Sequence, residues 1–340
     1  FEYFSRISKM GGNAKAVYRN TGTVKIYNGK LAYAEKLPFS EVDPNELVED
    51  VRILIMTLNS HASIWDKKTL DNWTMFFGSF DCLQRLSDRK EFIEAKPSIG
   101  DVDVAVPLEK MEALHCFLVS HEEKSITSRF KYVGQNRADF SGKKLNSIFE
   151  YTKCQKLLQI DFEGMNFFNG SPDEYVKFMR SSPWNDLKEG LKGLAHKYLL
   201  ASLARVASYK PNIVILTDKS PLHPKDKIKV KNLDEIPHSL TFSKEGVRDK
   251  LKQQMRMGFP VMVDGKYAYK EVPKEDSHFE RDLKKIFKRL FSRDPSSKDI
   301  EDFESYQGLL DICSRYLSRG KIESIYEYMV KTKLWGDKGQ

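Results

Sequence analysis

Two acidic residues on one predicted strand are the first candidates for chemistry. Asp101 and Asp103 alternate with valines in the run DVDVAV at 101–106. Side chains at i and i+2 of a strand share a face, so both carboxylates lie on one side and the valines on the other. Two carboxylates this close repel each other, and a hard divalent cation removes the repulsion. The pattern predicts a metal site, with the solvent face of an edge strand as the alternative.

A third acid lies in a second apolar run. Asp161 is set among core residues in the sequence LLQIDF at 157–162, which predicts another strand. A lone carboxylate among apolar neighbours is costly unless a metal or a hydrogen-bond donor meets it. Glu163 lies two residues further on and would share its face. We therefore expect Asp161 to have a partner of one of these two kinds.

A glycine-serine corner precedes both strands. The run WTMFF at 73–77 predicts a buried strand that stops at Gly78-Ser79, and a helical stretch through Leu83 follows. Glycine lets the backbone approach a ligand closely, and a helix N-terminus offers unpaired N–H groups. The corner would suit a phosphate. The alternative is that Gly78 and Ser79 only cap the helix.

Together, these residues resemble a known family. The Gly78-Ser79 corner, the Asp101-Val-Asp103 strand and the later Asp161 look like the motifs of the DNA polymerase β-like nucleotidyltransferase superfamily. The resemblance covers roughly residues 70–165. The gap from Ser79 to Asp101 is longer than this superfamily usually has, which implies that an insertion is looped out between them.

The resemblance implies a fold and a reaction. The fold would be α/β (α+β), with a five-stranded mixed sheet. The superfamily pattern implies two Mg²⁺ ions, with Mn²⁺ as an alternative, held by Asp101, Asp103 and Asp161. A nucleoside monophosphate would pass from an NTP, ATP foremost, to a hydroxyl, with release of pyrophosphate. Asp161 would lie nearest the acceptor and assist its deprotonation, while Gly78 and Ser79 would hold the β- and γ-phosphates.

A predicted helix at 185–207 is expected to complete the nucleotide site. Gly190, Gly193 and Lys197 share one side of it, where small residues would admit a triphosphate and Lys197 would neutralise it. His196 and Tyr198 are further nucleotide-binding candidates. The alternatives are that Lys197 is simply solvated and that Tyr198 packs in the core.

The elements around these residues predict three parts. Residues 1–40 form a basic β-ribbon, because Asn28-Gly29 between two alternating runs is a strong hairpin signal. Residues 41–182 form the nucleotidyltransferase core, and Asp43-Pro44 predicts the start of its first long helix. The residues from 87 to 100 are predicted to form a charged loop. Residues 183–340 form a mostly helical C-terminal domain that would complete the cleft.

The chain is basic, with a net charge of +8 and a pI of about 9.0. Residues 1–34 contribute six basic residues against one acidic residue, a net +5, and this predicts contact with a polyanion or a merely solvated basic face. An RNA end is thus the first expected acceptor. The alternatives are AMPylation-type modification of a protein or a small molecule, and a non-catalytic nucleic-acid-binding or structural protein. The six basic residues are Arg6, Lys9, Lys15, Arg19, Lys25 and Lys30.

Composition indicates an ordinary globular protein. Hydrophobic residues make up 40% and charged residues 31% of the 340 residues. No apolar run approaches the roughly 20 residues of a membrane helix, and no signal peptide is visible, so we expect no membrane association. The four cysteines share no close spacing, which predicts reduced thiols in a cytoplasmic protein. The sequence leaves the oligomeric state open.

Overall fold

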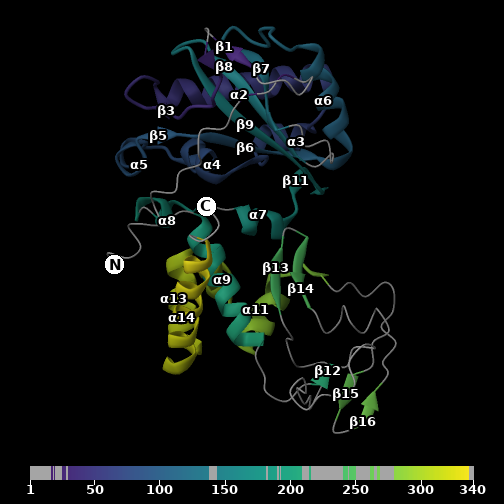
Figure 1. Ribbon diagram of the computed structural model, residues 1–340, viewed down its shortest axis with the longest axis vertical. Coiled ribbons are helices and arrows are strands. Elements are labelled where there is room, and N and C mark those ends of the chain that lie inside the picture. Colours follow the sequence, from purple (N-terminus) through teal and green to yellow (C-terminus); the bar gives the residue numbers. More distant parts are fainter. Residues whose placement is uncertain are drawn as a thin grey trace. The chain divides into compact units, whose positions relative to one another are not determined.

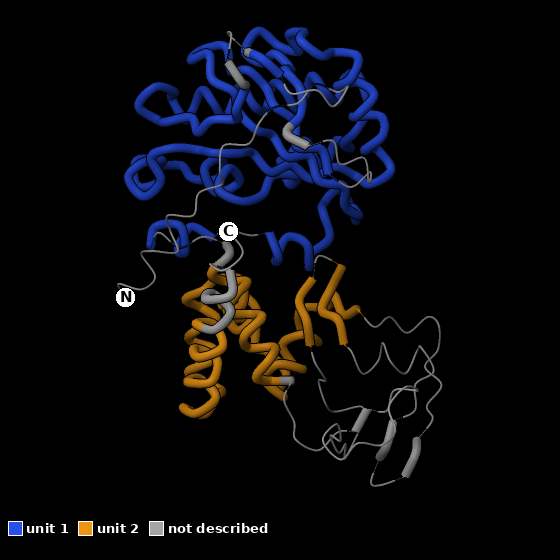
Figure 2. The backbone as a smooth tube through the Cα atoms, viewed as in Figure 1, with its two compact units in different colours: residues 1–193 blue, residues 194–340 orange. Residues whose placement is uncertain are grey.

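The chain forms two compact units, and each is described by itself. Unit 1 is Phe1–Gly193 and unit 2 is Leu194–Gln340 (Figure 2). The predicted division into three domains stays a prediction. The computed structural model describes residues 17, 19, 25–27, 30–137, 144–180, 183–189, 191, 193–208, 214–215, 240–243, 245–249, 261–263, 266–268 and 279–336.

A mixed five-stranded sheet is the centre of unit 1 (Figure 1). Its strand order is β4-β6-β9-β8-β7; β6 and β9 are parallel, and the other neighbours are antiparallel. The expectation of an α/β chain with a mixed sheet is confirmed. The strands are β4 (Phe76–Phe77), β6 (Asp101–Pro107), β7 (Phe130–Arg137), β8 (Lys144–Tyr151) and β9 (Lys156–Met165).

The long helix α2 (Pro44–Ala62) begins where the sequence predicts. The Asp43 side chain accepts hydrogen bonds from the backbone N–H groups of Asn45 and Glu46, and Pro44 opens the first turn. Its apolar stripe, which includes Leu54, lies in one core with the inward-facing valines of β6. Burial of this apolar stripe stabilises the packing of α2 on the valine side of β6. Polar residues can therefore lie on the opposite side of the strand.

Two local predictions in unit 1 are wrong. The predicted strand over 73–77 is confined to Phe76–Phe77, because Trp73 adopts a left-handed conformation that ends helix α3 (Lys67–Asn72). The predicted loop over 87–100 contains helix α5 (Lys90–Ala95) and strand β5 (Ser98–Ile99). The insertion between Ser79 and Asp101 is therefore ordered structure.

Shorter elements complete unit 1. Strand β5 pairs with β3 (Leu37–Pro38), and β10 (Phe167–Phe168) pairs with β11 (Ser171–Pro172). The single helix predicted over 185–207 is two helices, because α8 ends at Lys188 and α9 starts at Gly193. The remaining helices of unit 1 are α4 (Gly78–Arg85), the 3₁₀ turn η2 (Leu108–Lys110), α6 (Met111–Ser120), α7 (Glu174–Arg180) and α8 (Trp184–Lys188), whereas α9 (Gly193–Ser208) belongs to unit 2 from Leu194 onward.

The predicted N-terminal hairpin is present as β1 (Ile26–Tyr27) paired antiparallel with β2 (Lys30–Leu31). One of its basic residues points into unit 1. Lys25 is 4% exposed, and its Nζ donates at 2.8 Å to both Glu123 Oε1 and the Val133 carbonyl oxygen. This charge is neutralised within the protein and does not face a polyanion. Arg6, Lys9 and Lys15 lie outside the described residues.

Replacing Lys25 by Met is expected to lower the free energy of unfolding by about 2 kcal/mol, because the Val133 carbonyl loses a buried donor. Urea denaturation would measure the change. Arg19→Met is the matched control, since Arg19 lies 3.9 Å from the same Glu123 but is half exposed. A loss no larger than that of the control would mean that Lys25 does not hold the hairpin to β7.

Unit 2 contains helices and two small three-stranded sheets. The apolar side of α11 is buried, and Phe287 packs edge-on against Phe303. The predicted hairpin near 261–269 is present as β15 paired with β16. The elements are α9 from Leu194 onward, α11 (Leu283–Phe291), α12 (Ser297–Phe303), α13 (Tyr306–Tyr316), α14 (Arg319–Gly336), the sheet of β13 (Thr241–Ser243), β14 (Gly246–Arg248) and β17 (Phe279–Glu280), and the sheet of β12 (Val214–Ile215), β15 (Val261–Val263) and β16 (Lys266–Ala268).

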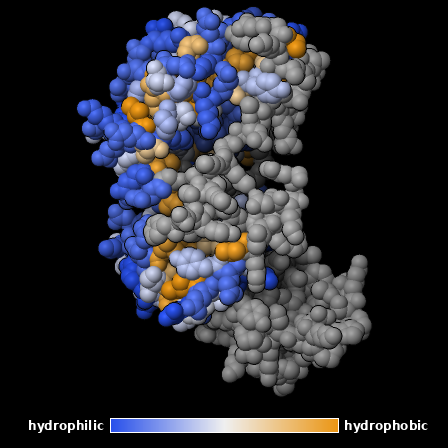
Figure 3. Space-filling view, turned by 60° about the vertical axis from the view of Figure 1, so that its left-hand side comes forward, coloured by the Kyte–Doolittle hydropathy of each residue, from blue (hydrophilic) through white to orange (hydrophobic). Residues whose placement is uncertain are grey.

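The described helices include none with the length and apolar character needed to cross a membrane. On the face of the molecule in Figure 3, most described residues are hydrophilic and the hydrophobic ones form small separate groups. Large apolar side chains with high exposure include Ile53 at 53% and Phe168 at 61%.

Candidate metal centre

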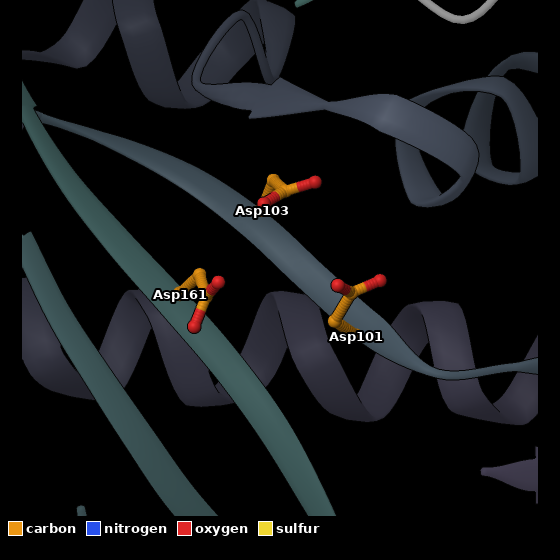
Figure 4. A group of neighbouring side chains, drawn as sticks. All are labelled: Asp101, Asp103 and Asp161. Carbon is orange, nitrogen blue, oxygen red and sulfur yellow. The ribbon is translucent and has the colours of Figure 1, made fainter. Parts of the chain in front are cut away.

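The parallel pairing of β6 and β9 brings the three predicted acids together. Asp103 lies directly opposite Asp161 in the register of the two strands, and Asp101 lies two residues earlier on β6. One carboxylate oxygen from each of the three lies within 4.8 Å of the others. The three side chains project from the same side of the two strands (Figure 4). The three side chains differ in solvent exposure: Asp101 is exposed, Asp103 is partly buried and Asp161 is buried.

Burial and mutual repulsion make this cluster unfavourable without a cation. Burial raises the pKa of Asp103 to about 7, the charges of Asp101, Asp161 and Glu163 add to the effect, and Arg180 opposes it. Burial also raises the pKa of Asp161, against the lowering effect of its hydrogen-bond donors. A divalent cation would relieve both penalties, and oxygen-only ligands suit Mg²⁺ or Mn²⁺.

The turn at Gly78-Ser79 lies next to the carboxylate of Asp103. Strand β4 pairs with β6 so that Phe77 lies opposite Asp103, and the chain turns directly into α4. Gly78 has φ +59°, and a Cβ there would lie 2.8 Å from Asp103 Oδ2. Only glycine fits this turn without displacing the carboxylate. The N-terminus of α4, with the buried Ser79, therefore lies beside the cluster, and the capping residue Phe77 makes no side-chain hydrogen bond to it.

Gly78→Ala is expected to reduce metal-dependent activity on the order of a hundredfold, because the added methyl group pushes Asp103 out of position. The same change should cost about 1–2 kcal/mol of stability, since alanine is strained at positive φ. Gly100→Ala is the matched control: it precedes Asp101, and its added Cβ would make only an ordinary 3.7 Å contact with Lys36. Equal activity of both variants would show that Gly78 does not set the position of Asp103.

Four further residues complete the site, and the sequence pattern did not assign them to it. They are Lys144, Gln159, Glu163 and Arg180. Lys144 Nζ lies 3.0 Å from Asp161 Oδ2 and 2.8 Å from Glu163 Oε1. The other Asp161 oxygen, Oδ1, accepts a hydrogen bond of 2.8 Å from Gln159 Nε2. Arg180, on α7, pairs with Glu163. These contacts fix the orientation of the Asp161 carboxylate.

Lys144 stays charged in this network. Burial lowers the pKa of Lys144, but the charges of Asp161 and Glu163 raise it by more, so that the pKa lies above its ordinary value. Period-two alternation on β9 does place Gln159 and Glu163 on the face of Asp161. Lys144 and Arg180 are not placed by this alternation, because Lys144 lies opposite Glu163 through the pairing of β8 with β9 and Arg180 lies on α7.

The predicted nucleotide-binding residues of α9 belong to unit 2. Tyr198 is 41% exposed, which excludes the alternative that it is a core residue. The preceding His196 is buried, with Nε2 3.0 Å from the Phe303 carbonyl oxygen, and burial lowers its pKa to about 4. Gly190 lies outside the described residues. The roles of Lys197 and Tyr198 in nucleotide binding stay predictions.

Comparison with protein-family models, with curated proteins and with solved structures finds no significant match to this chain. The resemblance to the nucleotidyltransferase superfamily therefore rests on the motif residues alone.

Proposed function

We propose that this protein is a metal-dependent nucleotidyltransferase that moves a nucleoside monophosphate from an NTP to a hydroxyl group and releases pyrophosphate. The observation that supports it most is the grouping of Asp101, Asp103 and Asp161, with carboxylate oxygens within 4.8 Å, beside the Gly78 turn and the start of α4. Oxygen ligands for a hard cation and free backbone N–H groups are what a metal-bound polyphosphate requires.

Each part of the site has its own task in this reaction. Asp101, Asp103 and Asp161 would hold Mg²⁺ or Mn²⁺, which supplies charge neutralisation at the transferred phosphate and activates the attacking hydroxyl. The N-terminus of α4, with Ser79, would donate hydrogen bonds to the β- and γ-phosphates of the NTP, ATP foremost. Asp161, held on its two oxygens by Gln159 and Lys144, would face the acceptor and receive its proton.

An RNA end is the acceptor that we propose first. Its support is the net charge of +8. The inward pairing of Lys25 reduces the share of this charge that the N-terminal hairpin can offer. Nucleotidylation of a protein or a small-molecule hydroxyl is the alternative. A non-catalytic protein is disfavoured, because all three acids are present and converge.

The acceptor experiment separates these classes. The protein is incubated with Mg²⁺ and each NTP labelled at the α-phosphate, together with RNA, DNA, a protein mixture or a small polyol. Label on RNA is the expected result, and Asp101→Ala should remove it. Label on protein or polyol alone would replace the acceptor and keep the reaction. Absence of label on every acceptor with every NTP would refute nucleotidyl transfer.

A further inference from the structure

A lysine lies on the Asp161 side of the carboxylate cluster. Lys144 Nζ contacts Asp161 Oδ2 at 3.0 Å and Glu163 Oε1 at 2.8 Å, and its side chain is 38% exposed. Among the described residues, ion pairs within 4.0 Å reach Asp161 and Glu163, whereas none reaches Asp101 or Asp103. The cluster thus has a side that is already paired with a cation and a side that is not.

The charges of the cluster lead to the same division. Its four described carboxylates are Asp101, Asp103, Asp161 and Glu163, and its two cations are the Lys144 ammonium and the Arg180 guanidinium. When all are ionised, a charge of −2 remains. A single divalent ion neutralises that charge, whereas a second ion would leave an excess of +2 in a partly buried site.

We propose that Lys144 supplies the positive charge on the Asp161 side that a second divalent ion would otherwise supply, so that the protein without nucleotide binds one divalent ion, between Asp101 and Asp103. This inference rests on the proposed function and replaces the two-ion arrangement expected from the superfamily resemblance. An ammonium group has three N–H donors, and Asp161 and Glu163 use two of them. The third would donate to the oxygen of the acceptor hydroxyl.

The number of bound Mn²⁺ ions tests this inference without any turnover. Mn²⁺ is titrated into the whole protein in the absence of nucleotide, and the free ion is counted by electron paramagnetic resonance. We expect one ion per chain for the wild type and two for Lys144→Met, because the variant frees an Asp161 oxygen and adds one negative charge to the cluster. Lys156→Met is the matched control: Lys156 is the first residue of β9, as Lys144 is of β8, but it pairs with the exposed Glu41, and one ion is expected.

Further variants locate the ion. Asp161→Asn should keep one ion, whereas Asp101→Ala should lose it. Two ions in the wild type, or one ion of unchanged affinity in Lys144→Met, would overturn the role of Lys144 and leave the proposed function standing. No ion in the wild type would overturn the metal centre and the proposed function with it. The wild-type count decides the matter even where Lys144→Met fails to fold.

Discussion

Asp103→Asn is expected to reduce nucleotidyl transfer on the order of a thousandfold or more and, in the absence of metal, to stabilise the fold. The first effect follows because Asp103 is the central ligand of the cluster and touches the Gly78 turn. The second follows because the substitution removes a carboxylate that burial and three neighbouring acids disfavour. Transfer rates with Mg²⁺ and unfolding curves in EDTA measure the two effects.

The sign of the pH dependence follows from the pKa of Asp103. That pKa is about 7 in the folded protein and 3.8 in its ordinary state, so between these values the folded protein holds the extra proton. Wild-type stability in EDTA should therefore fall as the pH rises through this range. The advantage of Asp103→Asn should be absent near pH 4 and reach on the order of 2–4 kcal/mol near pH 8. Added Mg²⁺ should stabilise the wild type and not the variant.

Asp71→Asn is the control for this experiment, because Asp71 is an exposed carboxylate on α3. It should leave activity and the pH dependence of unfolding unchanged. Full transfer activity in Asp103→Asn would remove this residue from the metal centre, and an unchanged pH dependence would show that the cluster does not repel as described.

Asp161→Asn is expected to separate binding from transfer. Asparagine keeps the shape of the side chain but neither carries the charge that Lys144 pairs with nor accepts a proton. Transfer should fall on the order of a hundredfold to a thousandfold, while the affinity for the Mg²⁺ complex of a non-hydrolysable NTP should change by no more than about threefold. Equilibrium binding and single-turnover rates give the two numbers.

The nucleotide affinity of Asp161→Asn, compared with that of Asp103→Asn, shows whether the two acids have different roles. If nucleotide affinity in Asp161→Asn drops as far as in Asp103→Asn, Asp161 holds the nucleotide-side ion and the division of roles is wrong. Gln159→Met is a useful companion, because it removes the hydrogen bond to Asp161 Oδ1 and keeps the carboxylate. It should show a smaller loss of transfer.

Elements with strong local signals could be predicted from the sequence. Helix α2 follows from its Asp43 cap and apolar stripe, and β6 and β9 follow from their apolar alternation. Helix α5 was missed because it lies in a charged stretch and buries only Phe92. Strand β7 has no such signal, because polar residues interrupt its apolar run.

Some features of the candidate site also follow from local sequence pattern, and others depend on the fold. The shared face of Asp101 and Asp103 follows from the period of a strand, but their distance from Asp161 depends on a parallel register that local pattern does not encode. Lys144 and Arg180 reach Glu163 from other elements, so only the fold reveals them. Lys25 shows the converse error, because a count of charges cannot distinguish an exposed lysine from a buried, paired one.

The position of the label in the NTP tests the central claim most directly. Wild-type protein and Asp101→Ala are each incubated with Mg²⁺, acceptor and ATP labelled at either the α- or the γ-phosphate. We expect wild type to transfer the α-label to the acceptor and to release the γ-label as pyrophosphate, and we expect Asp101→Ala to do neither. Transfer of the γ-label to the acceptor, or equal α-label transfer by Asp101→Ala, would contradict nucleotidyl transfer at these carboxylates.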